Sequence, residues 1–151
     1  TDDRSGATVA LADLVDQTST FHALTTGKKG WFMDLTQQPG ERVTHSPVLI
    51  AGTLYVTSYM PNSSPCTGGG QSWLYTLDFK DGSAPDNANG TANNVMTDRV
   101  QSEGDGILAD PSVDLLSETI ILQSSNTVLL TESIGGSLKR LMVRSWRQKW
   151  N

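Results

Sequence analysis

The chain has 151 residues, of which 36% are hydrophobic and 18% are charged, and its formal net charge is −5. This length suits one domain with one core. The hydrophobic and the charged fractions are both low, and Gly, Ser, Thr and Asn make up the difference. Such a balance favours short strands and long polar loops over helices or disorder. The acidic charge argues against nucleic acid as a partner, because phosphate binding needs a basic face.

The first half of the chain contains a succession of short apolar runs. Residues 8–18 allow one or two helical turns at most, and residues 31–35 form a compact strand-like run that ends at a Pro-Gly turn. Residues 48–50 and 53–57 flank an Ala-Gly turn and give the clearest hairpin pattern in the chain, because they are rich in β-branched and aromatic residues.

The next strand is predicted at residues 72–79, after a loop at 61–70 that is too rich in Pro and Gly to be regular structure. Its side chains alternate, so Trp73, Tyr75 and Leu77 are expected on one face of the sheet. A polar loop follows at residues 80–94.

Strand signals return at residues 95–96 and at Val100. The same order then recurs in runs at 106–108, 110–113, 118–123, 127–131 and 138–146. We therefore predict an all-β chain of about two four-stranded antiparallel units. A lead-in segment would cover residues 1–28, one unit residues 29–100 and the other residues 101–151. Units of this size in an all-β chain are typical of β-propeller blades.

Two blades do not close a propeller, which needs four to eight, and an unclosed pair would expose sheet edges. We therefore expect the chain to be the C-terminal part of a larger propeller, and the abrupt start at Thr1 agrees with this. A small sandwich of two sheets is the alternative. The sequence has no apolar run long enough to span a membrane and no signal-peptide pattern at its start.

Short motifs in order along the whole chain carry a family resemblance. They include DLVDQT at 13–18, KGWFMDL at 29–35, GERV at 40–43, PVL at 47–49, Gly52, Pro61, SPC at 64–66, Gly68 and Gly69, SWL at 72–74, Leu77 and Asp78, and SWR at 145–147. With these motifs the chain resembles the C-terminal region of the PilC/PilY family of type IV pilus tip adhesins and pilus biogenesis factors. The similarity is strongest over residues 29–78.

The resemblance implies a modified β-propeller that is exported to the bacterial cell surface and has no enzyme activity. It further implies a place at the pilus tip with the minor pilins, in pilus assembly, surface adhesion and twitching motility. The partners would be minor pilins, the remainder of the parent propeller and a host or abiotic surface. Some members of the family carry a calcium loop, but residues 81–90 lack that pattern. We therefore expect no cofactor in this chain, with calcium possible upstream in the parent protein.

The chain offers little that resembles a catalytic or metal site. His22 and His45 are far apart in sequence without a nearby cysteine partner, so structural or solvated roles are expected for both. The acidic residues Glu103, Asp105 and Asp110 could bind a cation or cleave a glycoside. A turn leading into a strand is the simpler interpretation of that segment.

The single cysteine, Cys66, cannot form a disulfide within the chain. It is either a buried apolar residue or half of a disulfide to another segment or another chain. Trp31 and Trp73 are expected to pack between sheets, and Trp146 near the end of the chain could contact a partner.

Docking to another protein is the predicted mechanism. The strand at residues 138–146 would offer its edge to a minor pilin, with Arg140, Arg144, Trp146 and Arg147 as the contact residues and the arginines facing acidic pilin surface. One alternative is a quinoprotein-like propeller enzyme that uses pyrroloquinoline quinone and calcium. Another is a carbohydrate-binding propeller with Trp31, Trp73 or Tyr75 as a stacking platform.

Overall fold

The computed structural model describes residues 8–62, 69–85, 96–126 and 129–133. Three small sheets and two single helical turns account for the regular structure of these segments. The prediction of a mostly β chain with antiparallel sheets is confirmed for the described residues. The propeller and the limits of the two units stay predictions.

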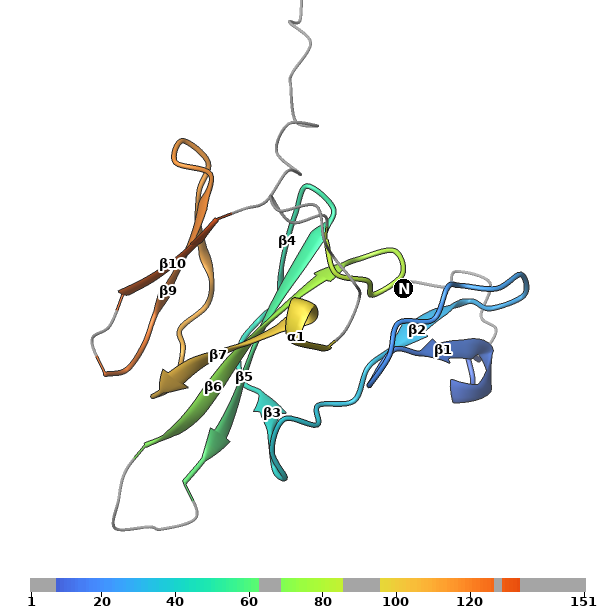
Figure 1. The fold of residues 1–151 in the computed structure, drawn as a ribbon, viewed down its shortest axis with the longest axis horizontal. Helices are drawn as coiled ribbons and strands as arrows, with labels where there is room; N and C mark the ends of the chain where they lie inside the picture. Colours follow the sequence, from blue (N-terminus) through green and yellow to red (C-terminus); the bar gives the residue numbers. More distant parts are fainter. Residues whose placement is uncertain (1–7, 63–68, 86–95, 127–128, 134–151) are drawn as a thin grey trace, which may run out of the picture.

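The central sheet is built around two long strands (Figure 1). Its strands are β3 (Arg42–Val43), β4 (Val48–Ile50), β5 (Thr53–Pro61), β6 (Gly70–Asp78) and β7 (Val100–Asp105). β5 and β6 pair antiparallel along their whole length, and β7 follows on the far side of β6. β3 and β4 both pair with β5, along the edge that β6 leaves open, so the sheet is four strands wide.

The predicted turn at Ala51 and Gly52 joins β4 to β5. Both residues have positive φ, 50° for Ala51 and 91° for Gly52. These values fit a type I′ turn, whose twist matches that of the two strands it joins. Gly52 adopts this conformation freely, whereas the Cβ of Ala51 makes it strained.

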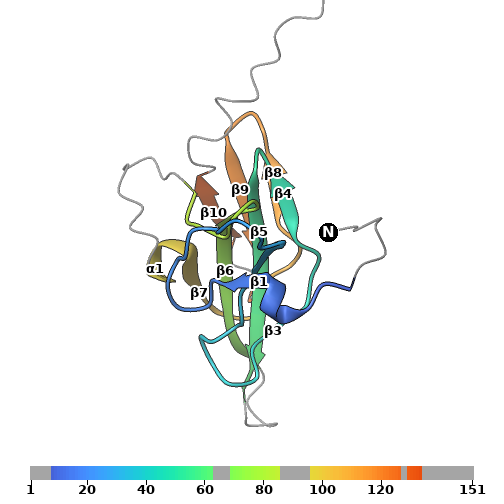
Figure 2. The same cartoon turned by 90° about the vertical axis from the view of Figure 1, so that its right-hand side faces the viewer.

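Both faces of the central sheet are buried. On one face Trp73, Tyr75 and Leu77 form a cluster with Trp31 and other side chains of the N-terminal segment. On the opposite face Tyr55 and Leu74 pack against Leu108, Ile120 and Leu122. Figure 2 looks along this stack, with β1 in front of the central strands and β9 behind them. The predicted alternation of residues 72–79 and the packing of Trp31 and Trp73 between sheets are confirmed.

The second sheet consists of β8 (Ser112–Asp114), β9 (Thr119–Gln123) and β10 (Leu129–Ser133), in the antiparallel order β10–β9–β8. Ile120 and Leu122 of β9 have no exposed surface, because they point at the central sheet. The predicted strand at residues 138–146 lies outside the described residues.

The N-terminal segment forms the third layer. A 3₁₀ turn (Leu11–Asp13) leads into β1 (Leu14–Asp16), which pairs in parallel with β2 (Gly30–Phe32). The expected helical turns at residues 8–18 are thus limited to one, and a strand follows. The Lys29 ammonium lies 3.4 Å from the Asp13 carboxylate, which holds the end of this turn beside β2.

A helical turn, α1 (Met96–Arg99), stands where the sequence predicts a strand. Arg99 is 1% exposed and its Nη1 donates to the carbonyls of Gln17, at 2.7 Å, and Gly82, at 3.4 Å. Burial lowers the pKa of this guanidinium. The helical turn ends at Arg99, and the strand that the sequence predicts here begins only at Val100.

A carboxylate fastens the loop before β3 to the central sheet. The hydroxyls of Ser58 and Tyr75 donate to Glu41 Oε1 at 2.5 and 2.7 Å, and the Gln37 amide donates to Oε2 at 2.9 Å. Burial and the adjoining Glu41 carboxylate both raise the pKa of the Tyr75 hydroxyl. The Tyr75 hydroxyl therefore keeps its proton in the folded protein.

Replacing the strained residue of the type I′ turn should stabilise the protein. Ala51→Asn is expected to raise the free energy of unfolding by about 0.5–1 kcal/mol, because Asn tolerates positive φ and Asn-Gly is the preferred pair. Gly52→Ala is the matched control and should lower it by about 1 kcal/mol. Urea unfolding measures both, and a destabilising Ala51→Asn would contradict the assigned turn.

Stability should fall at alkaline pH through Tyr75. Its pKa is raised in the folded state from the ordinary value of about 10. The stabilisation is therefore complete below about pH 10 and is lost as the pH rises further. Tyr75→Phe should lower stability at pH 7 by about 1–3 kcal/mol and flatten the decline above pH 10. Ser58→Ala removes the other hydroxyl donor and should keep that decline, as urea unfolding between pH 7 and 11 can establish.

Candidate functional site

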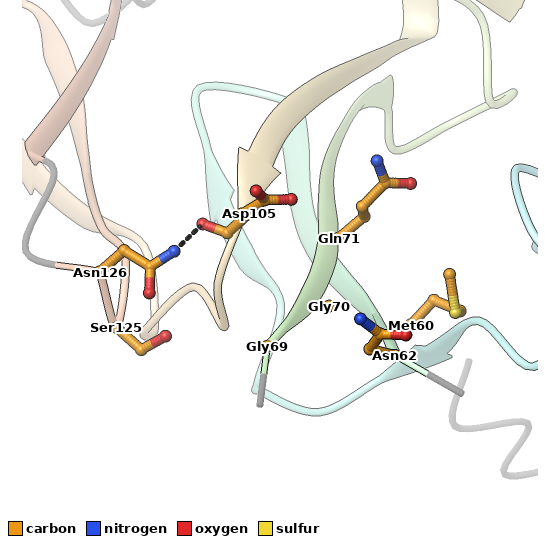
Figure 3. A pocket seen from close by; sticks show the side chains of 8 residues that line it. All are labelled: Met60, Asn62, Gly69, Gly70, Gln71, Asp105, Ser125 and Asn126. Carbon is orange, nitrogen blue, oxygen red and sulfur yellow. Dashed lines mark hydrogen bonds between the residues drawn. The ribbon is translucent and has the colours of Figure 1, made fainter. Parts of the chain in front are cut away.

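An open hollow of about 520 Å³, lined by both polar and apolar surface, lies at one end of the central sheet. Figure 3 labels the residues that line it, which come from the end of β5, the start of β6, the end of β7 and the loop after β9. The hollow therefore lies at the junction between the central sheet and the second sheet. Its described lining residues combine carboxamide, carboxylate and hydroxyl groups with two glycines and Met60, which also packs against the Trp73 cluster.

Three of the lining residues form a row across the central sheet. Met60 of β5 pairs with Gln71 of β6, and Gln71 pairs with Asp105 of β7. Directly paired residues project their side chains to the same face, with Cβ atoms about 4.5–5.5 Å apart. Within the described residues the structure records no hydrogen bond to the Gln71 carboxamide or the Asp105 carboxylate.

The floor of the hollow is the start of β6. The Tyr59 hydroxyl donates to the Gly69 carbonyl at 2.8 Å, and the Asn62 amide donates to the same oxygen at 2.9 Å. A Cβ on Gly70 would collide with the Met60 carbonyl and the Tyr59 ring. The backbone of the floor is thus fixed by internal contacts.

The link between the two sheets lies beside the hollow, on the face of β6 opposite to the Gln71 side chain. The Gly106 amide donates to the Gly70 carbonyl at 2.9 Å, and the Ser72 hydroxyl donates to the Gly106 carbonyl at 2.5 Å. Gly106 has a φ of 109°, and a Cβ there would collide with the Ser124 hydroxyl. Any other residue at this position would be strained and would collide with Ser124.

Side chains of the loop after β9 hold the same link from the other side. Asn126 Nδ2 donates to the Asp105 carbonyl at 3.0 Å, and Figure 3 shows this bond. The Ser125 hydroxyl accepts from the Ile107 amide at 3.0 Å. The backbone from Asp105 to Ile107 is therefore held by both sheets.

Of the acidic residues singled out in the sequence, the structure places Asp105 at the hollow. Glu103 and Asp110 are not among the residues that line it. No group of three or more His, Cys, Asp and Glu side chains that could hold a metal ion occurs in the described segments. The His22 amide donates to the Gln17 side chain, and the His45 ring bonds to Thr44.

The aromatic side chains proposed as a sugar-stacking platform lie inside the molecule. Trp73 is 6% exposed and Tyr75 is 1% exposed. Trp31 is half-buried in the same cluster, and its Nε1 donates to the Phe79 carbonyl at 3.2 Å. These residues stabilise the packing of the layers, and Trp73 and Tyr75 cannot stack on a ligand.

The residues predicted to contact partners lie outside the described part of the chain. They are Cys66, Arg140, Arg144, Trp146 and Arg147. Their roles stay predictions. Within the described segments, no helix is both long enough and apolar enough to cross a membrane.

Sequence reasoning missed the row at the hollow. Gln71 directly precedes the predicted strand at 72–79, and its neighbour across the sheet, Asp105, is 34 positions away. Only the register between β6 and β7 joins them, and a bulge at Ser72 and Trp73 shifts that register. Gly70, whose Cβ would meet the Met60 carbonyl, was the available sign of close backbone packing here.

Comparison with known proteins gives one informative similarity. No family model matches the chain, and no solved structure matches it. The chain is 40% identical over 62 residues to the type IV pilus biogenesis factor PilY1 homolog of Xylella fastidiosa (strain Temecula1 / ATCC 700964). The match covers 38% of this chain and 4% of the relative. The predicted resemblance to type IV pilus biogenesis factors is confirmed by this similarity.

Proposed function

We propose that this chain is part of a type IV pilus biogenesis factor, and that it acts at the pilus tip on the bacterial surface without enzyme activity. The observation that carries the proposal is the 40% identity to a factor of that name. The contribution of this chain would be to pilus assembly, surface adhesion and twitching motility, through contacts with other proteins.

The layered packing supports a role as one section of a larger stack of sheets. The central sheet is covered on both faces by other parts of the same chain, as a blade inside a propeller is. The second sheet exposes Leu129 of β10, at 63%, and Leu116 of the β8–β9 turn, at 98%. We propose that further sheets of the parent protein continue the stack.

Docking to minor pilins is proposed for the C-terminal segment on the basis of its sequence. An acidic chain that gathers Arg140, Arg144 and Arg147 within eight positions offers a basic contact for an acidic partner. The edge of a strand at residues 138–146 could add backbone hydrogen bonds to that contact.

Deleting the gene of the parent protein in its own bacterium tests the pilus role. Surface pili and twitching motility should be lost while the amount of major pilin in the cell stays normal, and the intact gene should restore both. Electron microscopy and a subsurface twitching assay measure the outcome. Normal piliation and motility in the deletion strain would rule out the proposal.

Reversing the basic charges near the C-terminus tests the docking mechanism. The variant Arg140→Glu/Arg144→Glu/Arg147→Glu should capture minor pilins at least about a hundredfold more weakly, since like-charge contacts cost several kcal/mol. The matched control is Lys28→Glu/Arg42→Glu/Lys80→Glu, which changes the net charge equally at other sites. Equal capture by both variants would exclude the arginine contact while leaving the pilus role standing.

A further inference from the structure

We propose that the open edge of β10 is covered by residues 138–143 of the same chain, in a register that places Leu141 beside Leu130 and Met142 beside Leu129. The four-stranded sheet so formed would present a basic and apolar outer face to a protein partner. The strand pairing does not depend on the pilus role, whereas the use of the outer face rests on the docking proposed above.

The edge of β10 offers unpaired backbone groups. β10 pairs with β9 along one edge, and no strand of the described segments pairs with the other. Natural proteins cover such an edge or blunt it with charge or proline, because it otherwise recruits strands of other molecules. The first three residues of β10, Leu129 to Thr131, carry neither a charge nor a proline. This edge therefore calls for a covering strand.

The core under the second sheet is incomplete at the same edge. Leu122 of β9 has no exposed surface, whereas its partner in register, Leu130 of β10, is only partly buried against the same cluster. An apolar side chain on a further strand would lie about 5 Å from Leu130 and would remove it from water. The covering strand thus needs an apolar residue at that position.

The sequence after β10 supplies that residue in the right register. A hairpin turn centred on Gly135 and Gly136, a pair that adopts positive φ freely, places Leu141 opposite Leu130. Because side chains alternate along a strand, Val143 joins Leu141 on the core face. A slip by one residue in either direction would turn Arg140 to the core, so the apolar pattern selects one register.

The short connection favours this segment over other strands. Ser133 ends β10, and Leu138 follows after four residues. Strands that are consecutive in sequence usually lie side by side, and so short a tether holds the segment at an effective concentration of about millimolar. A second copy of the chain would have to compete with it from free solution.

The same register gathers the predicted docking residues on one face. Leu129 is 63% exposed on the face of β10 that points away from the core. Arg140, Met142 and Arg144 would project from that face beside it, with Trp146 at the end of the row. Such a surface fits a partner that offers acidic groups around an apolar patch.

Engineered disulfides in the full chain test the register. The only cysteine, Cys66, is first replaced by serine. In that background Leu129→Cys/Met142→Cys should close within one molecule, because paired residues have Cα atoms about 4.5–5.5 Å apart. Its effective concentration in a glutathione buffer, measured by mass spectrometry, should exceed that of either control at least about tenfold.

The two controls are Leu129→Cys/Leu141→Cys and Leu129→Cys/Val143→Cys. Each shifts the second cysteine by one position and so turns it to the opposite face. Equal closure of all three pairs, or disulfides formed mainly between molecules, would overturn the pairing, provided that circular dichroism shows folded protein.

Stability measures the facing of the segment independently. Leu141→Glu should raise the unfolded fraction in urea at least about tenfold, because it places a charge beside Leu130. Met142→Glu should change that fraction by no more than about twofold, since the outer face is exposed. Equal effects of the two substitutions would contradict the proposed facing.

Capture of minor pilins tests the outer face. Leu129→Glu should weaken capture at least about tenfold, since it adds an acidic group beside the arginines. Leu116→Glu is the matched control, because Leu116 is 98% exposed on the β8–β9 turn. Equal capture by both variants would overturn the outer face. A wild type that captures no pilin would refute the docking itself, while the disulfide and urea results would still decide the pairing.

Discussion

The rest of the structure depends on the nine-residue pairing between β5 and β6. Both strands are rich in aromatic and β-branched residues and alternate between two apolar faces. Because each face must be removed from water, the sheet needs a cover on both sides. The N-terminal segment supplies one cover through Trp31, and the second sheet supplies the other through Ile120 and Leu122.

The hollow follows from the way in which these layers are joined. β7 ends at Asp105, and the chain crosses to the second sheet within a few residues. Hydrogen bonds from Ser72, Ser124 and Asn126 fix this crossing. The hollow lies beside this crossing, with residues of both sheets in its lining.

Local pattern predicted the elements of the central sheet well and their connections less well. The hairpin of β4 and β5, the alternation of β6 and the role of Trp73 are visible in the sequence because each depends on neighbours within a few positions. The Glu41 contact with Tyr75, the buried Arg99 and the pairing of Gln71 with Asp105 join residues far apart in the chain. Such contacts depend on register and layer packing, which no local pattern encodes.

The alternation along β6 also determines how the molecule can open. Leu74 and Tyr75 are adjacent in sequence, yet they belong to separate clusters on opposite faces. Loosening one outer layer therefore exposes one cluster and leaves the other intact, so each layer can exchange amide hydrogens as its own cooperative unit. The amides of β5 and β6, which both layers protect, should be the last to exchange. The central hairpin should therefore open more slowly than either outer layer.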